Sequence, residues 1–589
     1  MEQNRLKNIK NYIVGIVIFF IVTIIFYLFL FYEYTLIFGI NDDWTVYMVL
    51  SGSYLGEPDP YVLFFLYPLA WIICKLYTLT SAVPWYGLLL QGCFILSGFW
   101  IFIRFYTRCK NNKYILSIGA LLLFYFSNLR ILTSIQYTHA AAVCGASAIF
   151  CFVTAETKNV DCKGYLKANI PTIIMAALAL CIRKNAAFMC LPVAGMLFIA
   201  KWFWEDKNIN SEVIKKYLVF CISLCGVLGG LLLSQEIAYS SDLWSEYADI
   251  NYYREKVVDF YGTLGYEEMA DITENIGMTE EEYNLREEML PFYNADISYS
   301  EFLKIMMERS KEKYDLAHPF AVRLKEANNK MVHSIFDQDI GPQNHVVLIM
   351  FVASIIWIVG NKRWEICSFI FCYLFGRFFA WYYILFNGRF PIRIPQCLFN
   401  IDFLALLGIC LYLNKEGMCE EKVKRFMKIF KTGVLVCLIC ACLIGTKEAK
   451  KNGEYISIYQ DRWYGVKEYC MQHPENLYAL NGGSQTLLYF SDDVFDTSTI
   501  GQPQNYYAIS NFYSMSPNCF KKLGISAGGN MAEEIMEMEN HYWIYEKGCF
   551  SEEDLFIQYY KNNYDSFACE LVDVFNTETS TFEVYYFSK

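Results

Sequence analysis

Residues 12–38 read YIVGIVIFFIVTIIFYLFLFYEYTLIF, and this uninterrupted apolar run decides the class of the protein. A helix of about 20 residues crosses the roughly 30 Å hydrocarbon core of a bilayer. The run is too long for the core of a signal peptide and has no small-residue cleavage site, so it predicts a retained membrane span. Arg5, Lys7 and Lys10 precede it and predict a cytoplasmic N-terminus, because positive flanks stay on the inner side.

The composition of the whole chain supports a polytopic membrane protein. Of 589 residues, 55% are hydrophobic, 18% are aromatic and 19% are charged, and the mean hydropathy is +0.25. Soluble proteins carry about a quarter charged residues. A soluble globular enzyme, a disordered chain and a collagen-like chain are therefore excluded. The net charge of -11 argues against a nucleic-acid partner, because phosphate contacts need a basic face.

Further apolar runs predict an all-α bundle of about eleven transmembrane helices within residues 1–445. The predicted topology depends on residues 61–79, because they are long enough to cross the membrane. If they spanned, five basic loops would lie outside, against the positive-inside rule. We therefore predict that they form an amphipathic helix in the outer interface, with the C-terminus outside the cell. The predicted spans are residues 12–38, 85–104, 114–128, 132–155, 170–183, 186–205, 217–236, 345–360, 364–386, 393–413 and 428–445. The basic loops are residues 104–113, 158–167, 201–216, 362–363 and 415–428.

Two polar regions are predicted to project outside. Residues 237–344 hold 22 acidic and 10 basic side chains and are expected to be mainly helical. Residues 446–589 are expected to form an α/β domain, with strands at 477–480, 541–545 and 582–587 and helices at 460–472 and 551–562. Most of the 22 cysteines lie in apolar runs and act as small hydrophobic residues. Four lie in this domain and could form one or two disulfides if it is extracytoplasmic: Cys470, Cys519, Cys549 and Cys569.

An acidic pair, Asp42 and Asp43, follows the first span. One interpretation is structural, with Asn41 or Asp42 capping a helix and Asp43 complementing its dipole. The other is functional, because a carboxylate beside a low-dielectric region can act as a general base toward a hydroxyl group or can bind a divalent ion. The metal requirement stays open, with a divalent cation as the candidate.

Two cationic pairs are predicted at the outer membrane surface. Arg183 and Lys184 interrupt an apolar stretch at a helical hairpin turn, where they either snorkel to the interface or bind an anionic lipid phosphate. Arg389 and Arg393 lie in a second outer loop and suit a phosphate or pyrophosphate group. Arg377 lies within a span and is expected to face the bundle interior, in a structural or a functional role.

Gln136 and Tyr137 lie at the start of the fourth predicted span and are weaker candidates, which could support a site. His139 lies beside them, although a lone histidine in such a place is more often a packing residue. The nucleotide-binding motifs GxxxxGK[ST] and GxGxxG, and the metalloprotease motif HExxH, are absent from the sequence. An ATP-driven pump is therefore disfavoured.

The pattern NDDW…SG.Y.GEPD…PL.W…LY…PWYGL across residues 41–88, with the later Ile182-Arg183-Lys184, resembles the GT-C superfamily of glycosyltransferases, which use polyprenyl-phosphate sugars. It is most similar to a group of bacterial polytopic membrane proteins, over roughly residues 12–205. The acidic pair does not form the DxD motif of the superfamily, since its two aspartates are adjacent, and the WWDYG-type motif of oligosaccharyltransferases is absent from the C-terminal region. Transfer of a whole oligosaccharide to asparagine is therefore the less favoured branch.

The resemblance implies a catalytic acidic residue, Asp42 or Asp43, that accepts or orients the proton of the acceptor hydroxyl group. It also implies a lipid-phosphate contact at Arg183 or Lys184, with a looser match for Arg389 and Arg393. It implies a single displacement that moves a sugar from a polyprenyl-phosphate donor in the membrane lipid to an extracytoplasmic glycan, lipid or protein. The main alternative is a transporter or flippase for lipid-linked glycans or other substrates. A polysaccharide ligase or polymerase and a non-enzymatic scaffold are further alternatives.

Overall fold

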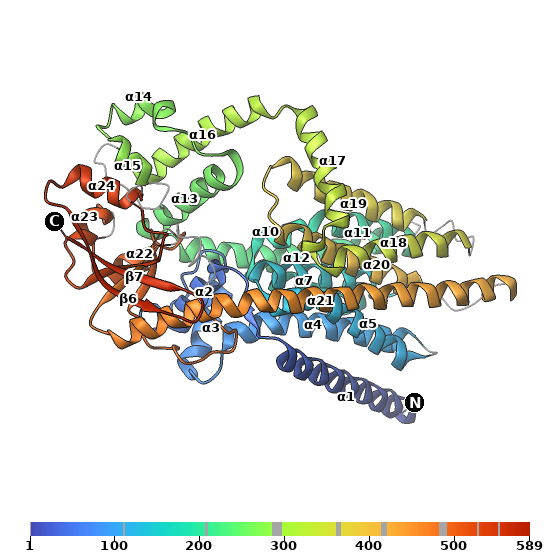
Figure 1. Cartoon of the computed structure of the whole chain (residues 1–589). Coiled ribbons are helices and arrows are strands. Elements are labelled where there is room, and N and C mark those ends of the chain that lie inside the picture. Colours follow the sequence, from blue (N-terminus) through green and yellow to red (C-terminus); the bar gives the residue numbers. More distant parts are fainter. Residues whose placement is uncertain are drawn as a thin grey trace.

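The computed structural model describes residues 2–109, 112–206, 210–285, 297–360, 367–413, 421–481, 492–509, 511–526, 529–551 and 554–588. The predicted basic loop at residues 362–363 and residues 415–420 of the last basic loop lie outside these ranges. Most described residues are helical, and the helices form a bundle with a sheet at one end (Figure 1). We call the end that carries the N-terminus the proximal end and the opposite end the distal end.

The bundle confirms the predicted helical membrane architecture. Among the described residues, eight helical stretches are long and apolar enough to cross a membrane, and they lie in α1, α4, α10–α11, α12, α18, α19, α20 and α21. A ninth is the pair α8–α9, which bends by 48°. The shorter apolar helices α5 and α7 correspond to the two remaining predicted spans. The bundle helices are α1 (Glu2–Glu33), α4 (Trp85–Arg108), α5 (Lys113–Ser127), α6 (Leu129–Thr133), α7 (Tyr137–Val153), α8 (Cys162–Ala168), α9 (Ile170–Ile182), α10 (Lys184–Met189), α11 (Leu191–Glu205), α12 (Ser211–Ala238), α18 (Pro342–Gly360), α19 (Cys367–Phe386), α20 (Arg393–Leu413) and α21 (Glu421–Gln472).

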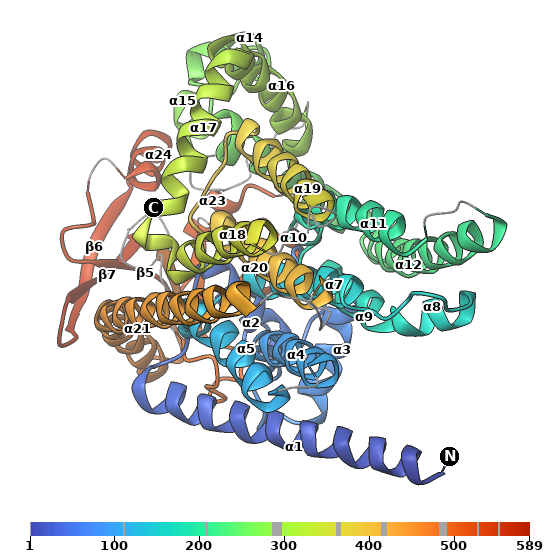
Figure 2. The ribbon, with the colours of Figure 1, turned by 90° about the vertical axis from the view of Figure 1, so that its right-hand side faces the viewer.

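Helix α7 lies in the interior of the bundle. All of its residues are buried, and it packs against α9 and α20. Figure 2, seen from the proximal end, shows α7 and α20 inside the bundle and α1 at its margin. Small side chains allow this close packing, since a Cβ at Gly145 would lie 2.5 Å from Cys190 Sγ.

The ends of several bundle helices meet at the proximal end through buried polar groups. Lys201 Nζ donates to Phe152 O (2.6 Å) and lies 3.8 Å from Glu205. The Glu205 carboxylate accepts hydrogen bonds from Thr157 (2.5 Å) and Tyr412 (2.7 Å). The C-terminal ends of α7, α11 and α20 therefore lie together at the proximal end. This arrangement is expected if the helices between them in the chain run back to the distal end.

Helix α3 (Tyr67–Leu79) covers most of the predicted interfacial segment, residues 61–79. It has 13 residues and is therefore about 20 Å long, shorter than the hydrocarbon core. Leu69, Ala70 and Ile73 on one face are buried in the protein. Its length is that of a helix that does not cross the membrane.

Both polar regions lie at the distal end (Figure 1). Residues 237–344, called the insert below, are helical in their described part. The C-terminal region contains a five-stranded sheet of order β4-β3-β5-β7-β6, in which β3 is parallel to β4 and β5, and β7 is antiparallel to β5 and β6. The insert elements are α13 (Asp242–Lys256), η1 (Val257–Tyr261), η2 (Tyr266–Met269), α14 (Ala270–Thr273), α15 (Glu280–Leu285), α16 (Tyr299–Ala317), α17 (Phe320–Phe336) and η4 (Gln338–Ile340). The C-terminal elements are β3 (Leu477–Asn481), β4 (Tyr506–Ile509), α22 (Pro517–Leu523), α23 (Met531–Met536), β5 (His541–Glu546), α24 (Leu555–Asn563), β6 (Ala568–Asn576) and β7 (Thr581–Ser588).

Some predicted boundaries are wrong. The first span ends at Glu33, and the chain then forms β1 (Ile37–Phe38), which pairs in parallel with β2 (Ser134–Ile135). Both strands were assigned to spans because their residues are apolar, and apolar character alone does not separate a short buried strand from a helix. Helix α21 continues through residue 445, so the boundary predicted there falls inside a helix.

Other predictions agree with the fold. Strands β3, β5 and β7 match the three predicted strands. The possible disulfides of this region do not form, since Cys470, Cys519, Cys549 and Cys569 are all free thiols. Arg377 faces the bundle interior as predicted. Its Nε lies 2.8 Å from Asp402 Oδ2, and Tyr373 OH donates to Asp402 Oδ1 (2.9 Å). This pairing gives Arg377 a structural role between α19 and α20.

Candidate active site

Strands β1 and β2 bring the acidic pair next to the first turn of α7. Helix α2 (Asn41–Ser51) follows β1 and α7 follows β2, so the two helices begin side by side. Gly39 lies at this junction, where its N–H donates to Ile135 O (2.8 Å). A Cβ at Gly39 would lie 2.7 Å from Gln136 Cγ and 2.8 Å from Ser134 O, so the close approach requires glycine.

Asp43 is completely buried and joins α2 to two bundle helices. Its Oδ1 accepts hydrogen bonds from Tyr86 OH (2.8 Å) on α4 and from Tyr137 N (2.9 Å) on α7. Tyr137 is the first residue of α7, and its N–H has no partner within that helix. Asp43 therefore supplies the hydrogen-bond acceptor for the first N–H group of a neighbouring helix.

The predicted cap of α2 itself is wrong. The N-cap residue is Ile40, not Asn41 or Asp42, and no side-chain hydrogen bond closes the helix start. Asp43 reaches α7 because the pairing of β1 with β2 places the two helix starts together, a contact that local sequence does not encode.

Burial raises the pKa of the Asp43 carboxyl well above its usual range, although the hydrogen bonds from Tyr137 and Tyr86 oppose the rise. A carboxyl with a raised folded-state pKa binds its proton more tightly in the folded protein. Its contribution to stability is fully present below the ordinary carboxyl pKa and is lost as pH rises through the raised pKa.

We expect Asp43→Asn to flatten the pH dependence of stability, because asparagine keeps a carbonyl acceptor for both donors and does not titrate. The melting temperature of the wild type in detergent should fall as pH rises above about 4, and that of the variant should fall less. Asp43→Ala is the comparison, since it leaves two buried donors unpaired at a cost of about 1–3 kcal/mol each. Identical pH profiles for the wild type and Asp43→Asn would contradict the assignment.

Asp42 is half-buried and lies in a polar cluster with Arg183. Its Oδ2 accepts a hydrogen bond from Tyr137 OH (3.3 Å), and the same hydroxyl accepts one from Arg183 Nη1. Arg183 Nη1 also donates to Thr138 Oγ1 (3.1 Å). The guanidinium lies over the rings of Phe64 (5.2 Å) and Tyr137 (4.8 Å). One tyrosine thus links the accessible carboxylate to an arginine with a fixed orientation.

The second cationic pair lies in the same region, but its two members differ. Arg389 Nη1 forms ion pairs with Asp259 (2.9 Å) and Glu255 (3.7 Å), which the insert supplies from η1 and the end of α13. Arg393, the first residue of α20, lies within electrostatic range of Asp259 and Tyr137. Glu255 is also within electrostatic range of Arg183. Neither carboxylate is predicted from sequence as a site residue, because single acidic residues carry no signal in a strongly acidic insert.

The remaining predicted site residues lie at the margin of the cluster around Asp42 and Arg183. Lys184 is exposed, and it makes no hydrogen bond or ion pair with the described residues. His139 is buried, and its Nε2 is hydrogen bonded to Gln396 Oε1 (2.9 Å), in agreement with a packing role. Gln136 packs against Gly39 and supports the start of α7.

The fold therefore gathers Asp42, Arg183, Arg389 and Arg393 from segments far apart in the chain at the distal end of the bundle. No protein-family model matches the chain, and no curated protein or solved structure matches it.

The C-terminal region holds the outer side of α2. Asn511 Nδ2 donates to Thr45 Oγ1 (2.9 Å), and Ser53 Oγ donates to Thr499 O (2.8 Å). Trp44 packs edge-on against Trp463, with ring centroids 5.6 Å apart. The acidic helix is thus fixed between the bundle and the C-terminal region, which suits a site that needs defined geometry.

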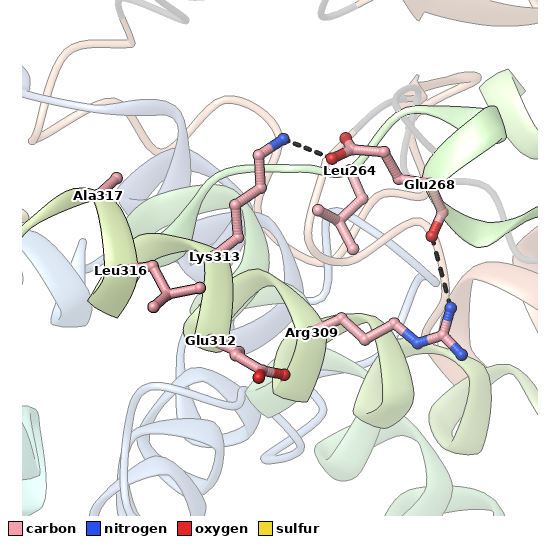
Figure 3. Close-up of a pocket in the computed structure, with 7 residues that line it drawn as sticks. All are labelled: Leu264, Glu268, Arg309, Glu312, Lys313, Leu316 and Ala317. Carbon is pink, nitrogen blue, oxygen red and sulfur yellow. Dashed lines mark hydrogen bonds and ion pairs between the residues drawn. The ribbon is translucent and has the colours of Figure 1, made fainter.

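A separate surface hollow of about 630 Å³ lies on the insert and involves none of the predicted site residues (Figure 3). Two of its cations are paired, since Lys313 Nζ lies 2.6 Å from Glu268 and Arg309 Nη1 lies 2.7 Å from Asp271, and Arg309 also donates to Glu268 O (3.4 Å). Within the described part of the chain, no three His, Cys, Asp or Glu side chains form a group that could hold a metal ion. The hollow is lined by Leu264, Glu268, Arg309, Glu312, Lys313, Leu316 and Ala317.

Proposed function

We propose that this protein is a membrane glycosyltransferase of the GT-C type. It moves a sugar from a polyprenyl-phosphate donor to an acceptor hydroxyl group at the distal side of the bundle. The observation that carries the proposal is the linkage of Asp42 and Arg183 through the Tyr137 hydroxyl. A base and a cation held at one site are what displacement at a phosphate-bearing carbon requires.

In the proposed reaction, the acceptor oxygen attacks the anomeric carbon of the donor. The bond from that carbon to the phosphate oxygen breaks, and the electron pair leaves on the polyprenyl phosphate. Asp42 accepts the proton of the acceptor hydroxyl group. Arg183 and Arg393 stabilise the negative charge on the leaving phosphate. Asp43 holds α2 against α7 and takes no part in proton transfer.

The proposal includes a membrane orientation. The proximal end is cytoplasmic, because the described ends of the basic loops gather there, and the distal end with the insert and the C-terminal region is extracytoplasmic. Helices α5 and α7 and the bent pair α8–α9 complete eleven spans. Helix α3 then lies at the outer interface, where a lipid-linked donor can approach from the bilayer.

The direct test uses purified protein in lipid nanodiscs with a panel of radiolabelled polyprenyl-phosphate sugars. Release of free polyprenyl phosphate from one donor, dependent on an added acceptor, would support transfer and name the sugar. Passage of an unchanged donor between the leaflets of proteoliposomes, with no release from any donor, would support the flippase alternative and overturn the proposal.

We expect Asp259→Asn to lower the KM for the donor by about two- to fivefold with little change in kcat. Loss of the ion pair frees Arg389 for the donor phosphate, and a partly exposed pair contributes roughly 0–1 kcal/mol. Initial rates over a range of donor concentrations measure the effect. Glu268→Gln is the matched control, because it removes another insert carboxylate that pairs with Lys313. A higher KM in Asp259→Asn would show instead that Asp259 positions Arg389 for the donor.

A further inference from the structure

The last hairpin of the chain leaves one edge of the C-terminal sheet open. Strand β6 is the end strand, and among the described residues it pairs only with β7. Most of its side chains are exposed, including Leu571 (48%), Val572 (43%) and Val574 (45%). Figure 2 shows β6 at the outer rim of the molecule. Such an edge presents main-chain N–H and C=O groups that can pair with another strand.

Strand β6 lacks two of the common protections of an exposed edge. Its sequence, ACELVDVFN, contains no lysine and no proline, the residues that commonly prevent pairing. One irregularity lies between Leu571 and Asp573. There the Asp573 carboxylate accepts hydrogen bonds from Val574 N (2.8 Å) and Tyr469 OH (2.8 Å). An added strand would therefore pair along residues 568–572, beside the exposed Leu571 and Val572.

The charge of the hairpin indicates what kind of strand fits. Residues 565–588 contain no lysine, arginine or histidine, and their five carboxylates are Asp565, Glu570, Asp573, Glu578 and Glu583. Antiparallel pairing with a second copy of this chain would bring like charges together, and like charges on paired strands are destabilising. Lysine or arginine side chains on the added strand would lie beside Glu570 and Asp573, the two carboxylates of β6 itself, and favour pairing.

We propose that the β6 edge is a docking site for an extended, basic segment of another protein, which adds to the sheet beside β6. Main-chain hydrogen bonds supply the affinity, and the side chains on alternate positions supply specificity. Leu571 and Val572 give the added strand apolar contacts, and the surrounding carboxylates select for positive charge. This proposal does not depend on the proposed transferase function.

The test uses the full-length protein in nanodiscs of zwitterionic lipid, so that a basic peptide does not bind the membrane. The probe is a fluorescent peptide of alternating lysine and valine with the length of β6, 9 residues. We expect saturable binding by fluorescence anisotropy. A peptide of alternating glutamate and valine should not bind, and N-methylation of alternate amides should weaken binding at least tenfold. Absence of binding by the lysine peptide, or equal binding by its N-methylated form, would overturn the proposal.

Two variants locate the binding site. Val572→Pro removes one edge N–H and should weaken binding of the lysine peptide at least tenfold. Glu570→Lys keeps the backbone intact, so it remains informative if the proline variant does not fold. It should weaken binding of the lysine peptide severalfold. Unchanged binding in Glu570→Lys would contradict the charge argument. A dimer in light scattering that Val572→Pro dissociates would identify a second copy as the occupant and overturn the proposal.

Discussion

Replacing Asp42 with asparagine should lower kcat for sugar transfer by about 10²- to 10⁴-fold, the usual effect of losing a general base. Asparagine keeps an acceptor for the Tyr137 hydroxyl, so the polar cluster should keep its geometry. The KM for the donor should therefore change little. Release of polyprenyl phosphate under saturating donor and acceptor measures the loss, and the melting temperature of the variant shows whether the fold is intact.

Asp43→Asn is the matched control, since it makes the same chemical change at the adjacent residue. Because Asp43 is buried and bonded to Tyr86 and Tyr137, this variant should keep kcat within a few-fold of the wild type. If the large loss occurred in Asp43→Asn and not in Asp42→Asn, the two roles would have to be exchanged. Full activity in both variants would exclude the proposed proton transfer.

Arg183→Gln should lower kcat by about 10²- to 10³-fold, or roughly 2.7–4 kcal/mol of transition-state stabilisation. The negative charge on the leaving phosphate grows during bond cleavage, so an oriented cation acts mainly on the transition state. Arg183→Lys should recover only part of the rate, because an ammonium group lacks the planar shape that packs over Phe64 and Tyr137. Single-turnover rates with saturating donor separate this step from product release.

Lys184→Gln removes the neighbouring charge and serves as the control. Lys184 is exposed, so this variant should change kcat less than twofold. Equal losses in Arg183→Gln and Lys184→Gln would mean that the local density of positive charge matters more than the hydrogen bond to Tyr137. The proposed leaving-group contact would then be wrong.

Hydropathy and charge predicted the general architecture of this protein. Long apolar runs predicted bundle helices because a segment with no water around it must satisfy its own backbone hydrogen bonds. The distribution of lysine and arginine predicted that residues 61–79 do not span, and α3 is too short to do so. The interior position of Arg377 also followed from sequence, because a charged side chain in a span needs a polar partner, which is Asp402.

Boundaries and caps were predicted less well, because they depend on residues distant in the chain. Residues 37–38 are as apolar as the helix before them, yet they form β1 because Ser134 and Ile135 offer a partner backbone. Asp43 lies in the first turn of its own helix, as expected, but it also accepts a hydrogen bond from the first N–H of α7, which was not predicted.

The sequence by itself indicated a helical membrane protein, and it predicted a candidate site made of an acidic pair and two cationic pairs. It did not separate Asp42 from Asp43 or Arg183 from Lys184, because adjacent residues share the same local signal. Only the tertiary structure distinguishes their surroundings. The junction of β1 and β2 buries Asp43 against Tyr86 and leaves Asp42 accessible beside Tyr137, and burial depends on distant segments that no local pattern records.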